Sequence, residues 1–300
     1  SDGHSVTALD DFSTGKPQNL ENLKQSDSFK LVEGSILDLR LVNDLVKGSD
    51  YVFHLAAAVG VFNIVNNPLA SLLTNIRGTE NILEAAHSSN TPVFITSSSE
   101  VYGKNISDSL KESDDRILGS PVTLRWSYSE AKAIDESLAY AYFVEKQLET
   151  RIVRFFNTVG PRQLGAYGMV VPRFVKSALA NEPITIYGDG TQTRCFAHVY
   201  DVIDAVIAIA FADNTIGKVI NIGNDFEISI NDLAQKVISE SGSKSEIVYV
   251  PYDEAYGDGF EDMERRVPNI DLINQLVGWK PKRDLTTIIS DISTEMKKNS

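Results

Sequence analysis

The chain has 300 residues, of which 42% are hydrophobic and 23% charged, with 19 Gly and 10 Pro. This composition excludes collagen-like, coiled-coil and disordered classes, and the length suits one large domain or two smaller ones. Acidic residues outnumber basic ones by 41 to 28, which gives a net charge of −13. Because a surface of this sign repels a phosphate backbone, we expect no nucleic-acid partner.

Cysteine and histidine usage excludes two further classes of site. The single cysteine, Cys195, cannot form an internal disulfide, and the histidines are too scattered to predict a metal centre. The sequence holds neither a long apolar run nor a basic region followed by an apolar segment at its start, so we expect no membrane span, no secretion signal and a cytoplasmic location. The histidines are His4, His54, His87 and His198.

The first 160 residues alternate short β-branched or aromatic runs with longer amphipathic stretches. This alternation is typical of strand–helix–strand units around a parallel sheet. The predicted strands, each dense in apolar residues like a strand buried on both faces, are 5–9, 29–33, 51–55, 92–97 and 150–154. The two longest predicted helices, with apolar residues three and four apart, are 69–89 and 128–145.

Beyond Asn157 the sequence changes, because clusters of Gly, Pro and Tyr separate shorter elements. This texture predicts a second, smaller lobe. Apolar periodicity predicts helices over 171–180, 230–241 and 285–297, and the run 219–222 is predicted to return to the first sheet as a late strand.

Acidic and hydroxyl side chains follow two of the predicted strands. Asp10 and Asp11 come after the first strand, where a carboxylate can accept hydrogen bonds from the ribose of a dinucleotide, although such residues are also common loop formers. The segment FITSSSEVYG places Ser98, Ser99 and Glu100 at the carboxyl end of the fourth strand. Open α/β sheets bind ligands at this edge, whereas the structural alternative is a turn that caps the next helix.

Tyr128 and Lys132, in RWSYSEAK, lie four residues apart and therefore on one face of the predicted helix. An ammonium beneath the phenol would favour the phenolate and make Tyr128 a general base near neutral pH. Tyr142 and Lys146 repeat the spacing deep inside the helix, where Tyr142 is expected to be a packed aromatic. Tyr128 differs because it opens its helix shortly after the Ser-rich strand end.

Together these motifs resemble, in order and spacing, the extended short-chain dehydrogenase/reductase family of NAD-dependent nucleotide-sugar epimerases, dehydratases and decarboxylases. Within it, the stretches SEVYG, LGSPVTLRWSYSEAK and AYGDGFEDMERRVPNI resemble UDP-glucuronate decarboxylases most closely. The motifs that carry the family resemblance are HLAAA, TNIRGT, SSSEVYG, YSEAK, RFFNTVGPR, GDGTQTRCF and RRVPNI.

The resemblance implies an α/β fold with a Rossmann-like doubly wound parallel sheet and a smaller C-terminal α/β substrate lobe. The NAD-binding domain would span 1–160 with about 195–223, and the nucleotide-sugar domain 161–194 and 224–300. The family's sheet begins with a strand and a G-x-x-G-x-x-G turn that are absent from this sequence, so a central strand is expected to be missing. Direct pairing of the neighbouring strands, a strand from another chain, or a further segment would each complete the sheet.

By the same resemblance, Ser98, Tyr128 and Lys132 form the hydride-transfer set, and Glu100 and Arg266 are the additional acid and arginine of the decarboxylases. The implied NAD-binding residues are Asp10, Asp11, Ile36, Leu55, Ala56, Ala57, Asn75, Tyr128, Lys132 and Phe155. The implied substrate-binding residues are Ser99, Asn157, Arg162, Arg173, Arg194 and Arg265.

The residue types suit a 4-keto mechanism. Tyr128 would remove the C4 hydroxyl proton as hydride leaves for NAD, and a ketone β to the C5 carboxylate would then ease the loss of CO2. In an acidic chain, the arginines of the second lobe are the cations that an anionic UDP-sugar needs, although Arg265 and Arg266 could instead form a solvated pair on a polar turn.

Two other functions stay open at the level of sequence. A UDP-sugar 4-epimerase needs the same Ser, Tyr and Lys, but it returns hydride to a rotated keto sugar without losing CO2. A non-catalytic remnant that binds sugar nucleotides would account for the missing glycine turn. The resemblance also implies a homodimer that pairs the two long helices.

Overall fold

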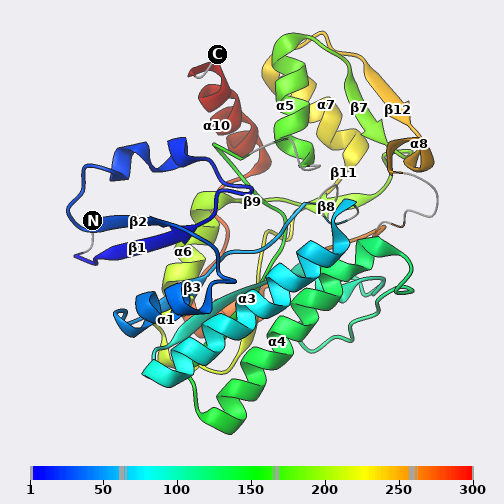
Figure 1. Cartoon of the computed structure of the whole chain (residues 1–300). Helices are drawn as coiled ribbons and strands as arrows, with labels where there is room; N and C mark the ends of the chain where they lie inside the picture. The colour runs from blue at the N-terminus through cyan, green and yellow to red at the C-terminus, as the bar shows by residue number, and fades with distance from the viewer. Residues whose placement is uncertain are drawn as a thin grey trace.

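The computed structural model describes residues 3–60, 64, 66–163, 165, 169–256, 261 and 263–298. Two lobes are stacked along the long axis of the molecule (Figure 1). The lower lobe in this view is built on parallel strands with helices on both faces, and the upper lobe carries α5 (Val170–Ala180), α7 (Ile230–Ser241) and α10 (Leu285–Lys298).

The main sheet has four parallel strands in the order β10-β5-β4-β3. Their bounds are β3 (Val52–His54), β4 (Val93–Ser98), β5 (Thr150–Phe155) and β10 (Val219–Ile222). The first five residues of β4 and of β5 are buried, which explains why both sequences read as continuous apolar runs rather than alternating ones. The register pairs Ser98 with Phe155, so the ends of β4 and β5 lie side by side.

A second parallel sheet consists of β1 (Val6–Asp10) and β2 (Phe29–Glu33) alone. Among the described residues, β1 and β3 do not pair with each other, so direct pairing across the missing central position does not occur. Apolar side chains beside this interruption stay exposed, with Val6 51% and Phe53 39% accessible. The expected break in the sheet is therefore confirmed.

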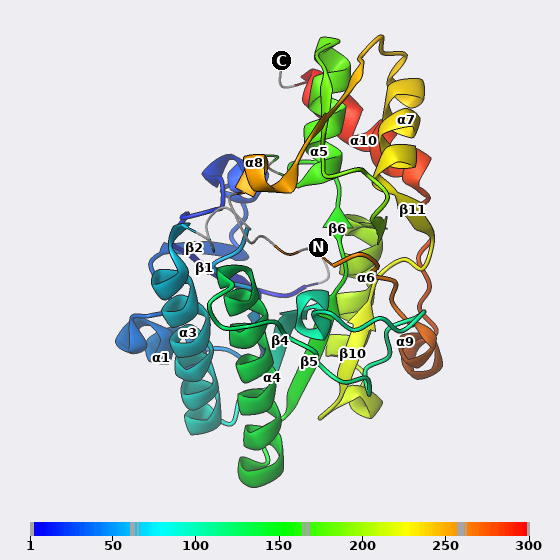
Figure 2. The same cartoon turned by 90° about the vertical axis from the view of Figure 1, so that its right-hand side faces the viewer.

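Helices cover the two faces of the main sheet. The helices α1 (Leu39–Lys47), α3 (Pro68–Ser89) and α4 (Ser127–Lys146) share one hydrophobic core with the strands. On the other face, α6 (Val199–Ala210) and α9 (Asp271–Val277) share a second core with them, and the two groups are separated in Figure 2. The helix α9 thus packs on the sheet, although its residues fall in the range predicted for the substrate domain.

In the upper lobe, α5, α7 and α10 enclose a core of their own. Three pairs of short strands support it: β7 (Ile184–Tyr187) with β12 (Ile247–Val250), β8 (Thr193–Cys195) with β11 (Glu227–Ser229), and β6 (Thr158–Val159) with β9 (Ala197–His198). The remaining short elements are η1 (Pro17–Leu23), η2 (Ser99–Tyr102), η3 (Leu124–Trp126), η5 (Asp213–Thr215) and α8 (Tyr252–Tyr256).

The structure places all of the strands and helices predicted by residue range within one residue of the expected bounds. Within the described ranges, none of the helices combines the length and apolarity needed to cross a bilayer.

Candidate active site

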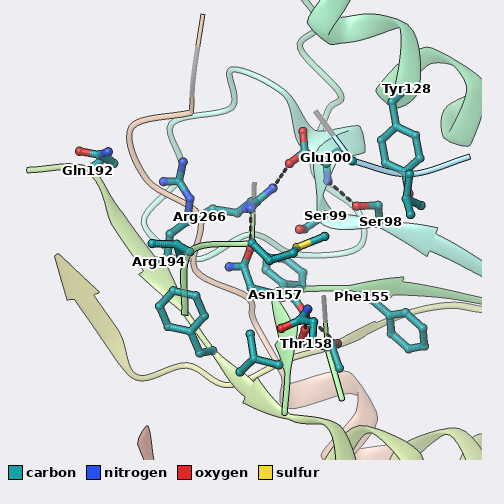
Figure 3. A pocket seen from close by; sticks show the side chains of 18 of the residues that line it. Ser98, Ser99, Glu100, Tyr128, Phe155, Asn157, Thr158, Gln192, Arg194 and Arg266 are labelled. Carbon is teal, nitrogen blue, oxygen red and sulfur yellow. Dashed lines mark hydrogen bonds and ion pairs between the residues drawn. The ribbon is translucent and has the colours of Figure 1, made fainter. Parts of the chain in front are cut away.

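A cavity of about 430 Å³ lies where the carboxyl ends of β4 and β5 meet the upper lobe (Figure 3). Ligands of open α/β sheets bind at this edge, because the loops that follow neighbouring parallel strands diverge there. From the sequence-predicted set, the cavity is lined by Ser98, Ser99, Glu100, Tyr128, Phe155, Asn157, Arg173, Arg194 and Arg266.

Ser98 and Tyr128 bring two hydroxyl groups to one wall of the cavity. Ser98 is the last residue of β4, and its Oγ accepts a hydrogen bond of 3.2 Å from the main-chain N–H of Glu100. Burial raises the pKa of the Tyr128 phenol above its usual value and the Glu100 carboxylate raises it further, whereas a hydrogen bond with Ser98 lowers it. The phenol is therefore protonated at neutral pH and can act as a donor.

Lys132 is paired elsewhere than expected. Its Nζ donates to the Thr96 carbonyl over 3.0 Å and to Asp135 Oδ2 over 3.1 Å. The side chains of Lys132 and Asp135 are 2% and 0% exposed, and neither residue lines the cavity. In the structure Asp135, three residues on, pairs with the Lys132 ammonium, and burial raises the pKa of Tyr128. That Lys132 favours the phenolate stays a prediction.

Glu100 is held between two arginines, and we call Glu100, Arg125 and Arg266 the arginine–glutamate cluster. Arg125 Nη1 donates to Glu100 Oε2 over 2.6 Å, and Arg266 Nη1 donates to Glu100 Oε1. Arg266 Nη2 also donates to Asn157 Oδ1 over 2.6 Å. Burial opposes ionisation of Glu100, but the two guanidinium groups outweigh it and hold the pKa of the carboxyl far below its usual range.

This cluster therefore carries two positive charges and one negative charge, and all three residues line the cavity. The surplus positive charge suits an anionic ligand group. Arg125 was not predicted from the sequence. Its signal was its place in RWSYSEAK, three residues before Tyr128.

The far end of the cavity combines cations, amides and aromatic rings. The Arg173 guanidinium lies 4.3 Å from the ring centre of Tyr187, and Gln192 Nε2 donates to the Tyr252 hydroxyl over 2.8 Å. Arg194 is 8% exposed and lines the same end. These groups suit a diphosphate and a flat base. Tyr187, Gln192 and Tyr252 were missed, because nothing in the sequence separated them from other loop residues.

Two predicted substrate arginines lie outside the cavity lining. Arg162 donates from its main-chain N–H to Glu295 and from Nη1 to the Asn19 carbonyl. Arg265 forms a two-bond pair with Glu227 and also contacts Asp108. Both residues thus make protein contacts outside the cavity lining, and their role as substrate contacts stays a prediction. Part of the segment that precedes Arg265, residues 257–260 and 262, lies outside the described residues.

Five of the predicted cofactor residues lie at the carboxyl ends of β1 and β3, namely Asp10, Asp11, Leu55, Ala56 and Ala57. Asp10 ends β1, and a Cβ added at Gly15 would lie 3.2 Å from Asp10 Oδ2, so the glycine leaves room beside this carboxylate. Asp10 Oδ1 accepts from the N–H of Phe12, and Asp11 Oδ1 accepts from the N–H and hydroxyl of Ser13. The Oδ2 side of Asp10, which faces Gly15, suits the ribose of a dinucleotide.

After β3, the loop of Leu55, Ala56 and Ala57 is held by Asn75, whose amide bonds both the N–H and the carbonyl of Ala58. Ile36 is buried, and its carbonyl accepts from Asn81. Phe155 stands at the end of β5 beside Ser98 and lines the cavity (Figure 3). The residues present thus fit the two ends of NAD, one at Asp10 and one at the cavity.

The fold and the side chains at this edge of the sheet define a Rossmann-type dinucleotide-dependent enzyme. The model of the NAD dependent epimerase/dehydratase family matches residues 1–223. The chain belongs to this family, whose cofactor is NAD.

Relatives with assigned names include two decarboxylases. The chain is 39% identical to the UDP-N-acetyl-alpha-D-glucosaminuronate decarboxylase of Bacillus cytotoxicus over 280 residues, which covers 93% of this chain and 86% of that protein. It is 33% identical to UDP-glucuronic acid decarboxylase 1 of Danio rerio over 282 residues, which covers 93% of this chain. The match spans 64% of the Danio rerio protein, just under two thirds of its length.

Among solved structures, the UDP-glucuronic acid 4-epimerase from Bacillus cereus, in complex with UDP-glucuronic acid and NAD, superposes with a TM-score of 0.87 at 27% identity. The match covers 99% of this chain and 92% of that one.

Proposed function

We propose that this protein is an NAD-dependent decarboxylase of a UDP-linked uronic acid. The observation that carries the proposal is the surplus positive charge of the arginine–glutamate cluster, which lines the same cavity as the hydroxyls of Ser98 and Tyr128. A neutral hexose has no group to match that charge, whereas a sugar carboxylate does. Both decarboxylase relatives are named for uronic acid substrates, which supports the assignment.

The chain's residues fit the chemistry of such a reaction. When bound, NAD would accept the hydride of the sugar C4 and later return it. The O4 proton that leaves with the hydride would pass to Tyr128 as the phenol gives its own proton to solvent, and the reverse transfer would accompany the return of the hydride. In the 4-keto sugar the bond between C5 and the carboxylate carbon breaks, CO2 leaves, and the electron pair moves into an enolate whose charge rests on O4. Tyr128 and Ser98 can donate hydrogen bonds to that oxygen. C5 then takes one proton from solvent, so one carboxylate and one proton become one CO2 and one C–H bond.

Glu100 has a separate role in this proposal. Because Arg125 and Arg266 keep its pKa low, Glu100 is an acceptor rather than a proton donor. Its negative charge, set beside a substrate carboxylate, disfavours the charged ground state, and that repulsion is relieved when neutral CO2 forms.

Epimerisation at C4 is the second candidate, favoured by the likeness to the UDP-glucuronic acid 4-epimerase structure. Both candidates use Ser98 and Tyr128, and both accept an anionic sugar. They differ in whether the sugar carboxylate survives the reaction.

The test is to incubate the full chain with NAD and, separately, with UDP-glucuronate or its N-acetylated uronate counterpart, and to determine the product mass. Loss of the mass of CO2 is the expected result. An unchanged mass with an altered C4 proton coupling would replace decarboxylation by epimerisation.

Tyr128→Phe should lower turnover by about 10²–10⁴-fold while nucleotide affinity changes little. Calorimetry with NAD decides the remnant hypothesis, which micromolar binding would exclude.

We also propose that the chain forms a homodimer through α3 and α4. These helices lie side by side on the outside of the sheet (Figure 2), and α4 exposes Ile134, Tyr140 and Val144. Exposed apolar side chains on one outer layer favour a protein partner. Light scattering at micromolar concentration should give the dimer mass, and Val144→Glu should lower it. A monomer mass for the unaltered chain would contradict the proposal.

A further inference from the structure

Two guanidinium groups contact Glu100, and they come from different parts of the chain. Arg266 belongs to the segment before α9, whereas Arg125 lies in η3, directly before α4. Arg125 and Arg266 are each 7% exposed, and each takes a different oxygen of the Glu100 carboxylate. Each arginine is thus a separate ion-pair partner of Glu100. One guanidinium can move away from the carboxylate while the other stays bound to it.

Arg125 is held firmly. The neighbouring Trp126 is fully buried, and its indole N–H donates to Glu261 Oε2 over 2.8 Å. The Arg125 guanidinium lies 5.1 Å from the centre of the Trp126 ring. Gly119 packs so closely that an added Cβ would lie 2.2 Å from the indole nitrogen. The turn that carries Arg125 therefore has little room to move, and it leads straight into the helix that carries Tyr128.

Arg266 has an additional partner in the wall of the cavity. Besides Glu100, its guanidinium bonds Asn157, which follows β5 in the wall of the cavity (Figure 3). A carboxylate ligand in the cavity would compete with Glu100 and Asn157 for the hydrogen bonds of Arg266. If Arg266 were the only partner of Glu100, this competition would leave a buried acid unpaired, which is costly.

We propose that Arg125 is a positioning residue: it keeps the Glu100 carboxylate in place while Arg266 turns to the carboxylate of the substrate. This inference rests on the proposed function. It assigns different tasks to the two arginines, since Arg125 acts through Glu100 and Arg266 contacts the ligand. Among the described residues, the charged or titratable groups that act on or are acted on by Glu100 include Arg125 on η3, Arg266 before α9 and Tyr128 on α4.

The test compares Arg125→Gln with Arg125→Lys, first without substrate. Carboxyl carbons of glutamate are followed by ¹³C NMR titration, and the Glu100 signal is assigned by its loss in Glu100→Gln. In Arg125→Gln the pKa of the Glu100 carboxyl should rise by at least about 1, because one of its two cations is gone. In Arg125→Lys most of that rise should disappear, because a cation is restored. An unmoved titration would overturn the proposal even if the protein never released CO2, so its failure is distinguishable from failure of the proposed function.

Kinetics test the same idea with substrate. Arg125→Gln should lower kcat at pH 6 by about tenfold or more, with KM changed by less than about threefold, and should add an acid limb to the pH profile of kcat. In a Glu100→Gln background the further change to Arg125→Gln should alter kcat by less than about twofold, because the group it acts through is gone. If Arg125→Gln lowered kcat by the same factor in the Glu100→Gln background as in the wild type, Arg125 would contact the substrate directly. If Arg125→Gln lowered the melting temperature but left the pH profile of kcat unchanged, its role would be structural only. Either result would overturn the proposal.

Discussion

Two groups of buried charges act on Tyr128, and they differ in net charge and in access to ligand. The arginine–glutamate cluster holds one surplus positive charge and lines the cavity. The pair of Lys132 and Asp135 is neutral, almost fully buried and outside the cavity lining. Buried charges that cancel serve to hold a helix and a strand in register, whereas buried charges that do not cancel leave an attraction for an anionic ligand.

Breaking the neutral pair should have the largest effect on stability. Asp135→Asn leaves the Lys132 ammonium buried without its counter-ion, which should lower the free energy of unfolding by about 3–5 kcal/mol. Urea denaturation followed by far-UV circular dichroism measures the change. The matched control is Asp204→Asn, because Asp204 is exposed and its contact with Lys282 is a long one of 4.0 Å. This variant should lower the free energy of unfolding by less than about 1 kcal/mol. Equal losses in the two variants would contradict the distinction between the pair and an ordinary surface contact.

Removing one charge from the cluster should act on selectivity. Arg266→Gln should weaken binding of a UDP-uronate by about 10–100-fold, the range expected for hydrogen bonds to a charged group, and should change the affinity for the neutral UDP-hexose much less. Calorimetric titration with both ligands gives the comparison. Arg265→Gln is the control, since Arg265 pairs with Glu227 outside the cavity lining and should leave both affinities within about twofold. If Arg266→Gln weakened both ligands equally, the surplus charge would have no part in recognising the uronate.

The neutral pair has a neighbour whose titration should be visible in the pH dependence of stability. His54 is 3% exposed and its Nε2 lies 3.0 Å from the Thr79 hydroxyl. Burial, with a smaller effect of Lys132, lowers the pKa of His54 to about 3. Because the unfolded chain then binds this proton more readily, the stabilisation is complete above about pH 6.5 and is lost as the pH falls towards 3; at pH 5 the loss is about 2 kcal/mol.

His54→Gln should remove that part of the pH dependence, measured as the urea midpoint between pH 5 and pH 7.5. The exposed His87 provides the control, and His87→Gln should keep the wild-type slope. An unchanged slope in His54→Gln would show that carboxyl groups, not His54, produce the dependence.

Much of the fold followed from local pattern. The strands of the main sheet were predicted closely because buried parallel strands read as short apolar runs with clear ends. The helix α6, VYDVIDAVIAIA, was not assigned, because it is apolar around most of its circumference and shows no clear polar face. The two-stranded pairs of the upper lobe were missed because strands of two to four residues are too short to show a period.

The site was predicted in its residue types more than in its contacts. Ser98, Glu100, Tyr128 and Arg266 meet at one cavity as expected. Spacing placed Lys132 on the same helix as Tyr128, but it could not show that the Lys132 ammonium pairs with Asp135. Arg125 was not predicted, because the arginines expected to bind substrate lie in the second lobe, whereas the turn before α4 brings Arg125 to the cavity from the first.

The sequence by itself determined the strands of the main sheet, its long helices and the family, because these depend on apolar runs and on motifs that are contiguous in the chain. Only the tertiary structure decided which charges meet. Glu100 finds its partners 25 and 166 residues away, and Arg162 and Arg265 find theirs away from the cavity. Such pairings depend on how distant loops converge at one edge of the sheet, and no local pattern of residues encodes that convergence.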